Sequence, residues 1–139
     1  MNRQLAILDT SFIVACLCER DVHHKQGKKI YKQIKQKYYL IIPDIVFGET
    51  VSVLARRAKE WEFDFRKVLY YLKQMCPHPA MFATYMILFF DEVLKLVEET
   101  DGELNFNDAL IVIGAREEGV RKIVTFDRDF KDYLEVIGV

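Results

Sequence analysis

The chain has 139 residues and a formal net charge of −1, with 51% hydrophobic and 29% charged residues. This length and composition predict a single domain over residues 1–139 and exclude intrinsic disorder, a collagen-like repeat and a disulfide-stapled miniprotein. Because 20 basic residues nearly balance 21 acidic ones, any attraction for RNA or DNA has to be local.

The first half of the chain alternates strand and helix patterns. Residues 5–8 are an unbroken apolar run, which predicts a strand buried on both faces of a parallel sheet. Lysines recur at helical spacing between residues 23 and 38, which predicts an amphipathic helix with a basic outer face. A second strand is expected at 39–42, followed by a helix over about 44–60 that Asp44 is placed to cap.

The second half continues with helices and two short strands. The spacing of apolar residues predicts helices over 65–75 and 85–100, joined as a helical hairpin around two prolines. A helix over about 107–118 and strands over 122–126 and 134–137 follow. Strands separated by helices, without two-residue hairpin turns, indicate an α/β fold with a mainly parallel central sheet.

Neither a membrane nor a disulfide framework is expected. The longest apolar stretches fall far short of the roughly 18 residues that a membrane span requires. Asp9 interrupts the apolar run near the N-terminus, which opposes a secretory signal. Cys16, Cys18 and Cys76 are an odd number without a C-x-x-C pair, which suits a reducing compartment. We therefore expect a cytoplasmic protein.

Four acidic residues occupy positions where α/β proteins bind ligands. In a parallel sheet, ligands bind at the carboxyl ends of the strands. Asp9 directly follows the first predicted strand, Asp127 follows the strand over 122–126, and Asp108 opens the helix leading into that strand. Glu49 lies inside the helix after the second strand, on or beside its apolar face.

Each of these residues also has a purely structural interpretation. Asp9 and Asp108 are suited to capping helix N-termini, and Asp127 to a turn. Arg56 and Arg57 lie about two helical turns from Glu49, and either suits an ion pair with it. Taken singly, none of the four establishes a functional site.

Taken together, the four carboxylates indicate a metal site. Carboxylates converging at one sheet edge repel one another and acquire raised pKa values unless a cation neutralises them. A set of oxygen ligands without cysteine or histidine favours Mg²⁺ or Mn²⁺ over Zn²⁺. Such a site suits hydrolysis of phosphodiester bonds by metal-activated water. The pattern therefore predicts a metal-dependent nuclease.

The motifs around these residues resemble those of the PIN domain family, and among its members the VapC-type toxin ribonucleases. Residues 8–15, Leu-Asp-Thr-Ser-Phe-Ile-Val-Ala, resemble the family's opening strand and first acidic position. Glu49 resembles the second acidic position, Asp108 the third and Asp127 the fourth. The match runs almost from end to end of the chain.

The resemblance implies a fold, an activity and partners. The implied fold has three layers, with a sheet of four or five mainly parallel strands between helices. The implied activity is endoribonuclease action on RNA with Mg²⁺ or Mn²⁺, in which Ser11 and Thr125 orient Asp9 and Asp127. Asp129 shares the last loop with Asp127 and competes with it for the place facing the metal. The implied partners are a small VapB-like antitoxin that blocks the acidic site and a second copy of the chain.

Two alternative functions remain open at this stage. The first is a PIN-like module that binds metal or RNA without cleaving, and the second is a housekeeping nuclease for RNA processing. The lysines over 25–35 are either a stripe that follows phosphates or an ordinary solvated helix face. Trp61, Phe63 and Phe65 are expected to contribute to an oligomer or antitoxin surface, and His23 and His24 are expected to be exposed.

Overall fold

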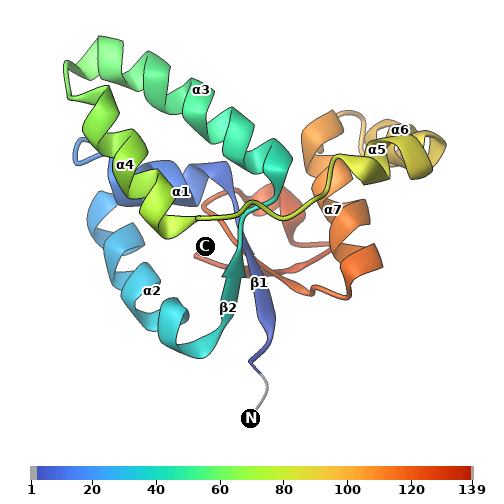
Figure 1. Ribbon diagram of the computed structural model, residues 1–139. Helices are drawn as coiled ribbons and strands as arrows, with labels where there is room; N and C mark the ends of the chain where they lie inside the picture. The colour runs from blue at the N-terminus through green and yellow to red at the C-terminus, as the bar shows by residue number, and fades with distance from the viewer. Residues whose placement is uncertain (1–2, 139) are drawn as a thin grey trace.

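The computed structural model describes residues 3–138 and centres on a parallel sheet (Figure 1). The sheet has four strands in the order β2-β1-β3-β4, and all three neighbouring pairs are parallel. The strands are β1 (Leu5–Leu8), β2 (Tyr39–Ile41), β3 (Lys122–Val124) and β4 (Glu135–Ile137). The predicted α/β class and parallel sheet are confirmed, and four is the number of strands in the described residues.

Helices connect the strands and flank the sheet. They are α1 (Thr10–Leu17), α2 (His24–Lys37), α3 (Asp44–Trp61), α4 (Phe65–Met75), α5 (Thr84–Leu88), α6 (Phe90–Glu99) and α7 (Phe106–Glu118). A short 3-10 helix, Arg128–Phe130, precedes β4. In the described part of the chain, no helix has the length and apolar character that crossing a membrane requires. The bounds predicted for α2, α3 and α4 agree with the structure to within one residue.

Helix α1 was not among the helices predicted from periodicity, although the sequence offers Asp9 as a cap for a helix that starts there. It begins directly after Asp9, and its residues Thr10, Phe12, Ile13, Val14 and Ala15 are buried. It packs against α2 and α3, so it has no wide polar face. A helix that is apolar on nearly every side lacks the 3.6-residue alternation by which an amphipathic helix is recognised.

The predicted helical hairpin of residues 65–75 and 85–100 is wrong. Helix α4 packs on α3, whereas α5 and α6 pack on α7, and the two groups lie on opposite sides of the molecule (Figure 1). The second predicted helix is also divided, since α5 ends at Leu88 and α6 begins at Phe90. Local periodicity predicted that helices are present but not which neighbours they pack against.

Asp44 holds the segment that crosses between these two groups. Its Oδ1 atom accepts hydrogen bonds from the backbone N–H groups of Ile45 (2.8 Å), Phe82 (3.0 Å) and Ala83 (3.1 Å). Pro43 also pairs with Ala80 in a parallel bridge. Asp44 is thus the first residue of α3 and not its N-cap, which is Pro43, and its carboxylate fixes the crossing segment beside the helix.

The crossing segment packs tightly on α7 through Phe82. Phe82 is buried, and a Cβ atom at Gly114 of α7 would lie 2.5 Å from its ring. The absence of a side chain at Gly114 thus lets the two segments approach. Helix α7 is buried over residues 109–115, and its N-terminal turn carries Asp108.

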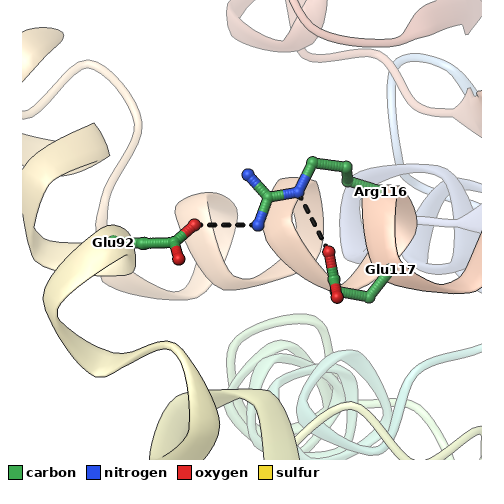
Figure 2. Close-up of polar contacts among 3 residues, drawn as sticks. All are labelled: Glu92, Arg116 and Glu117. Carbon is green, nitrogen blue, oxygen red and sulfur yellow. Dashed lines mark hydrogen bonds and ion pairs between the residues drawn. The ribbon is translucent and has the colours of Figure 1, made fainter.

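An ion-pair group ties α6 to the outer end of α7 (Figure 2). The Arg116 Nη2 atom lies 2.8 Å from Glu92 Oε2, and its Nε atom lies 3.1 Å from Glu117 Oε2. These side chains are exposed, so each pair contributes little to stability. The buried side chains of Val93 and Leu96 in α6 supply the larger apolar contribution.

Candidate active site

Asp9 lies at the carboxyl edge of the sheet, between β1 and the start of α1. Its backbone N–H donates to the carbonyl of Val124 at 3.0 Å, which continues the pairing of β1 with β3. Its side chain is buried, with 8% of the residue exposed, and Oδ2 accepts a 2.8 Å hydrogen bond from the Thr125 hydroxyl. Although Asp9 occupies the N-cap position of α1, its side chain makes no capping hydrogen bond to the backbone N–H of the second or third residue of the helix. The carboxylate is thus held by the loop after β3.

Ser11 and Thr125 form a hydrogen-bond chain that ends on Asp9. The two hydroxyl oxygens lie 3.0 Å apart, and the Phe126 N–H donates to Ser11 Oγ at 3.0 Å. A hydroxyl has one proton to donate. Because Thr125 gives its proton to Asp9, Ser11 must be the donor in the Ser11–Thr125 bond. Thr125 thus contacts Asp9 directly, whereas Ser11 is hydrogen-bonded to Thr125 and not to Asp9 itself.

Asp127 is joined to the same chain through its backbone. Its N–H donates to Thr125 Oγ1 at 3.0 Å, and its own Oδ1 accepts from the Asp129 N–H at 2.8 Å. The second bond begins the 3-10 helix, so the predicted turn role of Asp127 is confirmed. A turn role and a place beside Asp9 are compatible, because only one carboxylate oxygen of Asp127 takes part in the turn.

Asp108 lies in the first turn of α7, but it is not the residue that begins the helix. Asn105 is the N-cap: its Oδ1 accepts from the Asp108 N–H at 2.8 Å, and Asp108 Oδ2 accepts from the Asn105 N–H at 3.3 Å. This reciprocal pair is a capping box. The predicted helix start at Asn107-Asp108 is therefore two residues late, and Asp108 contributes to the cap as its third residue.

Glu49 is exposed on α3, beside buried neighbours rather than among them. The next residue, Thr50, is fully buried, and its hydroxyl donates to the Val46 carbonyl at 2.7 Å. Thr50 Oγ1 also lies 3.3 Å from the buried hydroxyl of Thr10, which follows Asp9. This contact places α3 and Glu49 against the start of α1. In the described residues, no ion pair joins Glu49 to Arg56 or Arg57.

The charges of the four acidic residues act on one another. The pKa of Asp9 is raised to about 6, mainly by burial and also by the charges of Glu49 and Asp127, while hydrogen bonds from Thr125 and the Thr10 backbone oppose the shift. The pKa of Asp108 is raised to about 7, mainly by burial and also by the charges of Asp9, Asp127 and Glu49, while the hydrogen bond from the Asn105 backbone opposes the shift. The structure thus brings the four predicted residues within electrostatic reach of one another.

Asp129 stands apart from this group. Its side chain is exposed, and its pKa is raised by a hydrogen bond to Asp127 and by the charge of Asp127. Asp127 contributes to the pKa shifts of both Asp9 and Asp108, whereas Asp129 contributes to neither. Of the two candidates in the last loop, Asp127 is therefore the one whose charge acts on Asp9 and Asp108. The four residues Asp9, Glu49, Asp108 and Asp127 are called the acidic cluster.

The acidic cluster suits open coordination of an ion such as Mg²⁺ better than a site in which protein side chains supply every ligand. Within residues 3–138, no three histidine, cysteine, aspartate or glutamate side chains lie close enough to form a metal site by themselves. Mg²⁺ is usually held by one or two carboxylates, with water and substrate phosphate as its other ligands. An open set of carboxylates, two of them with raised pKa values, fits that mode of binding.

Two residues that support the site were not identified from the sequence. Thr50 fixes α3 beside α1, and its only sequence signal is a polar residue on the buried face of a predicted helix. Gly138 has a φ of 121°, and a Cβ atom there would lie 2.5 Å from the Thr125 carbonyl oxygen. The Thr125 N–H also donates to the Ile137 carbonyl at 2.9 Å. Gly138 therefore lets the end of β4 close on Thr125.

Comparison with known proteins gives a consistent family assignment. A model of the PIN domain family matches residues 6–135. A curated VapC ribonuclease from Aquifex aeolicus is 26% identical over 128 residues, which cover 91% of this chain and 90% of the relative.

Two solved structures share the fold. VapBC2 from Rickettsia felis, bound to a DNA fragment from its promoter, superposes with a TM-score of 0.72 at 17% identity, covering 96% of this chain and 98% of the other. VapC20 from Mycobacterium tuberculosis, a toxin that cleaves the sarcin-ricin loop, gives a TM-score of 0.71 at 21% identity, with coverage of 91% and 93%. Since the family model spans all four acidic positions, the chain belongs to the PIN domain family, as its motifs predict.

Proposed function

We propose that this chain is an endoribonuclease that requires Mg²⁺ or Mn²⁺ and serves as the toxin of a toxin-antitoxin pair. The observation that carries the proposal is the acidic cluster at the carboxyl edge of the sheet, in which a buried carboxylate is held by a chain of hydroxyls. The names of its relatives, a VapC ribonuclease and a toxin that cleaves the sarcin-ricin loop, support RNA as the substrate.

Each carboxylate has a role in this proposal. Asp9 and Asp108 would hold the ion, and Glu49 and Asp127 would complete the negative charge around it. A bound divalent ion activates the attacking water and stabilises the charge that develops on the phosphate. Thr125 keeps Asp9 in one orientation through its hydrogen bond to Oδ2, and Ser11 keeps Thr125 in place. The three free cysteines agree with a reducing compartment, as expected of a cytoplasmic enzyme.

We further propose that a VapB-like antitoxin binds in a groove between the α1–α2 and α3–α4 helix pairs. The groove has a volume of about 1150 Å³. Its lining combines basic and aromatic side chains, including Arg20, Lys28, Lys32, Trp61, Phe63 and Tyr71. Trp61 carries the guanidinium groups of Arg57 and Arg20 over its ring, at 4.5 and 5.5 Å. This lining suits a protein segment with apolar and acidic side chains.

We also propose that two copies of the chain associate through an apolar surface on α5 and α6. This α5–α6 surface consists of exposed Met86, Ile87, Leu88, Phe90 and Leu94. Ile87 is 78% exposed and Leu88 is 65% exposed. A contiguous exposed apolar surface is typical of a protein contact, and two identical surfaces meet in a twofold dimer.

Cleavage of RNA tests the nuclease directly. The wild type is expected to cut single-stranded RNA with Mg²⁺ or Mn²⁺ and to lose activity in EDTA. Asp9→Asn, Asp108→Asn and Asp127→Asn are each expected to reduce kcat by about 100-fold or more, because each removes a charge that the ion requires. Asp129→Asn is the matched control and should stay within about threefold. Cleavage that survives EDTA, or full activity in both Asp9→Asn and Asp108→Asn, contradicts the mechanism.

The pH dependence of the stability of the metal-free protein tests the raised pKa of Asp9. The pKa of Asp9 is about 6 in the folded protein, against an ordinary value of 3.8. The folded state therefore binds the Asp9 proton more tightly than the unfolded state does. The contribution of Asp9 to the free energy of unfolding falls as pH rises from about 4 to about 6. Asp9→Asn should stabilise the metal-free protein at pH 7.5 by about 1–3 kcal/mol, with little effect at pH 4. Equilibrium urea unfolding measures the difference.

Magnesium completes that test. Added Mg²⁺ should raise the melting temperature of the wild type at pH 7.5 and leave Asp9→Asn unchanged, since a ligand stabilises only the state that binds it. Asp132→Asn is the control, because this exposed carboxylate lies outside the acidic cluster. An equal Mg²⁺ response in wild type and Asp9→Asn contradicts the site. Metal binding without cleavage of any RNA favours the non-catalytic module.

The association state tests the α5–α6 surface. The wild type should sediment at twice the 16.4 kDa mass of the chain. Ile87→Glu places a charge in the middle of the proposed contact and should give a monomer that remains folded. Val22→Glu is the control, since Val22 is 90% exposed and lies outside this surface. A monomeric wild type, or an Ile87→Glu variant that stays dimeric, contradicts the proposed dimer.

Two adjacent tyrosines test the antitoxin groove. Tyr71 lines the groove, whereas Tyr70 does not. If a small DNA-binding protein is encoded beside this chain, Tyr71→Glu should weaken its binding by at least about 10-fold by calorimetry, because it puts an acid in a basic groove. Tyr70→Glu should bind it like the wild type. The absence of such a neighbouring gene counts against the toxin assignment. Equal binding by both variants counts against the groove.

A further inference from the structure

An aromatic stack runs from the core to the surface beside the acidic cluster. The imidazole of His23 lies face to face with the ring of Phe126, with centroids 4.3 Å apart and an interplanar angle of 10°. Phe12 lies on Phe126 as well, with centroids 6.0 Å apart. Phe12 is fully buried, Phe126 is half-buried and His23 is exposed. The stack therefore ends in an imidazole that is open to solvent.

The inner part of the stack is joined to the acidic cluster. Phe126 lies between Thr125 and Asp127 in the sequence, and its backbone N–H donates to Ser11 Oγ at 3.0 Å. Ser11 in turn donates to Thr125, which holds Asp9. The residue on which His23 stacks is thus one position from one carboxylate of the cluster, and two hydroxyls connect it with another.

His23 is exposed, but its backbone is fixed. Its N–H donates to Asp21 Oδ1 at 2.9 Å, and its carbonyl accepts from the Gly27 N–H at 2.7 Å. The neighbouring ring of His24 is hydrogen-bonded through Nδ1 to the Ala15 carbonyl at 2.8 Å. A preorganised aromatic face loses little conformational entropy when a ligand stacks on it.

An RNA substrate needs an attraction that the acidic cluster does not supply. Carboxylates repel phosphates, and the net charge of −1 gives no general attraction. Stacking of a base on an aromatic side chain is attractive whatever the net charge of the surface. The basic residues of α2, including exposed Lys25, Lys28 and Lys29, begin two residues after His23 and suit the phosphates of the same strand.

We propose that the outer face of His23, supported by Phe126, stacks on an unpaired base of the RNA adjacent to the scissile phosphate. This inference rests on the proposed nuclease function and adds a substrate-binding residue to it. Stacking requires a base that is not paired, so it selects single-stranded or loop RNA over a continuous duplex. His23 acts here through its flat ring.

Substitutions at His23 test the stack. With a single-stranded RNA oligonucleotide, His23→Ala is expected to raise KM about 10-fold and to change kcat less than about twofold, because it removes one stacking contact. His23→Phe keeps a flat ring and should retain the KM of the wild type. Val22→Ala is the matched control in the same loop and should behave as wild type.

Abasic RNA identifies the stacked base. Replacing the nucleotide on one side of the cleavage site by an abasic residue should raise KM about 10-fold for the wild type, with no further increase for His23→Ala. A KM for His23→Ala equal to that of the wild type overturns the proposal. So does a His23→Phe variant as weak as His23→Ala, which would assign the effect to hydrogen bonding or charge. A His23→Ala variant with lower kcat and melting temperature at unchanged KM has only a structural defect, and also overturns it.

Binding measurements separate failure of this proposal from failure of the nuclease. The same oligonucleotide, carrying a fluorescent label, is titrated with each protein in Mg²⁺ and followed by anisotropy. Binding that His23→Ala weakens about 10-fold, without cleavage by the wild type, contradicts the nuclease and supports the stacked base. Cleavage with identical binding by the wild type and His23→Ala contradicts the stacked base alone. Absence of any RNA binding contradicts both.

Discussion

The hydrogen bond from Thr125 to Asp9 connects the fold of this chain with its site. It joins the residue after β1 to the residue after β3, so the two central strands determine where the carboxylate lies. The same hydroxyl accepts the N–H of Asp127, and Ser11 donates to it from α1. Loss of this one hydroxyl would leave Asp9 without its side-chain donor and would remove one of the hydrogen bonds that hold the loop carrying Asp127. Gly138 belongs to this arrangement, because a side chain there would collide with the Thr125 carbonyl.

Holding four carboxylates close together opposes folding, and the structure shows how the opposition is limited. Only Asp9 is buried, and it receives hydrogen bonds that favour its charged form. Asp108 and Asp127 each use one oxygen in a local backbone bond, in the capping box and in the turn. Glu49 stays in solvent on α3, where its charge costs little. In the proposed function a divalent cation would relieve the repulsion that remains, so the same feature that opposes folding without metal would provide affinity for the ion.

The parts of the structure that follow local rules could be predicted from the sequence, and the parts that depend on long-range packing could not. The strand over 5–8, the helix over 65–75 and the four acidic positions follow from apolar runs, helical spacing and strand ends. Helix α1 was missed because a helix buried on several sides lacks an amphipathic pattern. The hairpin of α4 with the next helix was wrong, because Asp44 and the Phe82–Gly114 contact carry the chain across to α7. The roles of Thr50 and Gly138 depend on neighbours that are distant in sequence.

The nearly balanced charge of the chain conceals an uneven distribution. Negative charge gathers at the carboxyl edge of the sheet, whereas lysines cover the outer face of α2. In the proposed function, an RNA strand that meets this surface would be attracted by one region and repelled by the other, so its phosphate would reach the acidic cluster only with a cation present. Between the two regions lies the exposed ring of His23, whose stacking attraction is independent of the sign of the charge. Its position at the start of α2 allows the base to be held while the phosphates on either side experience opposite fields.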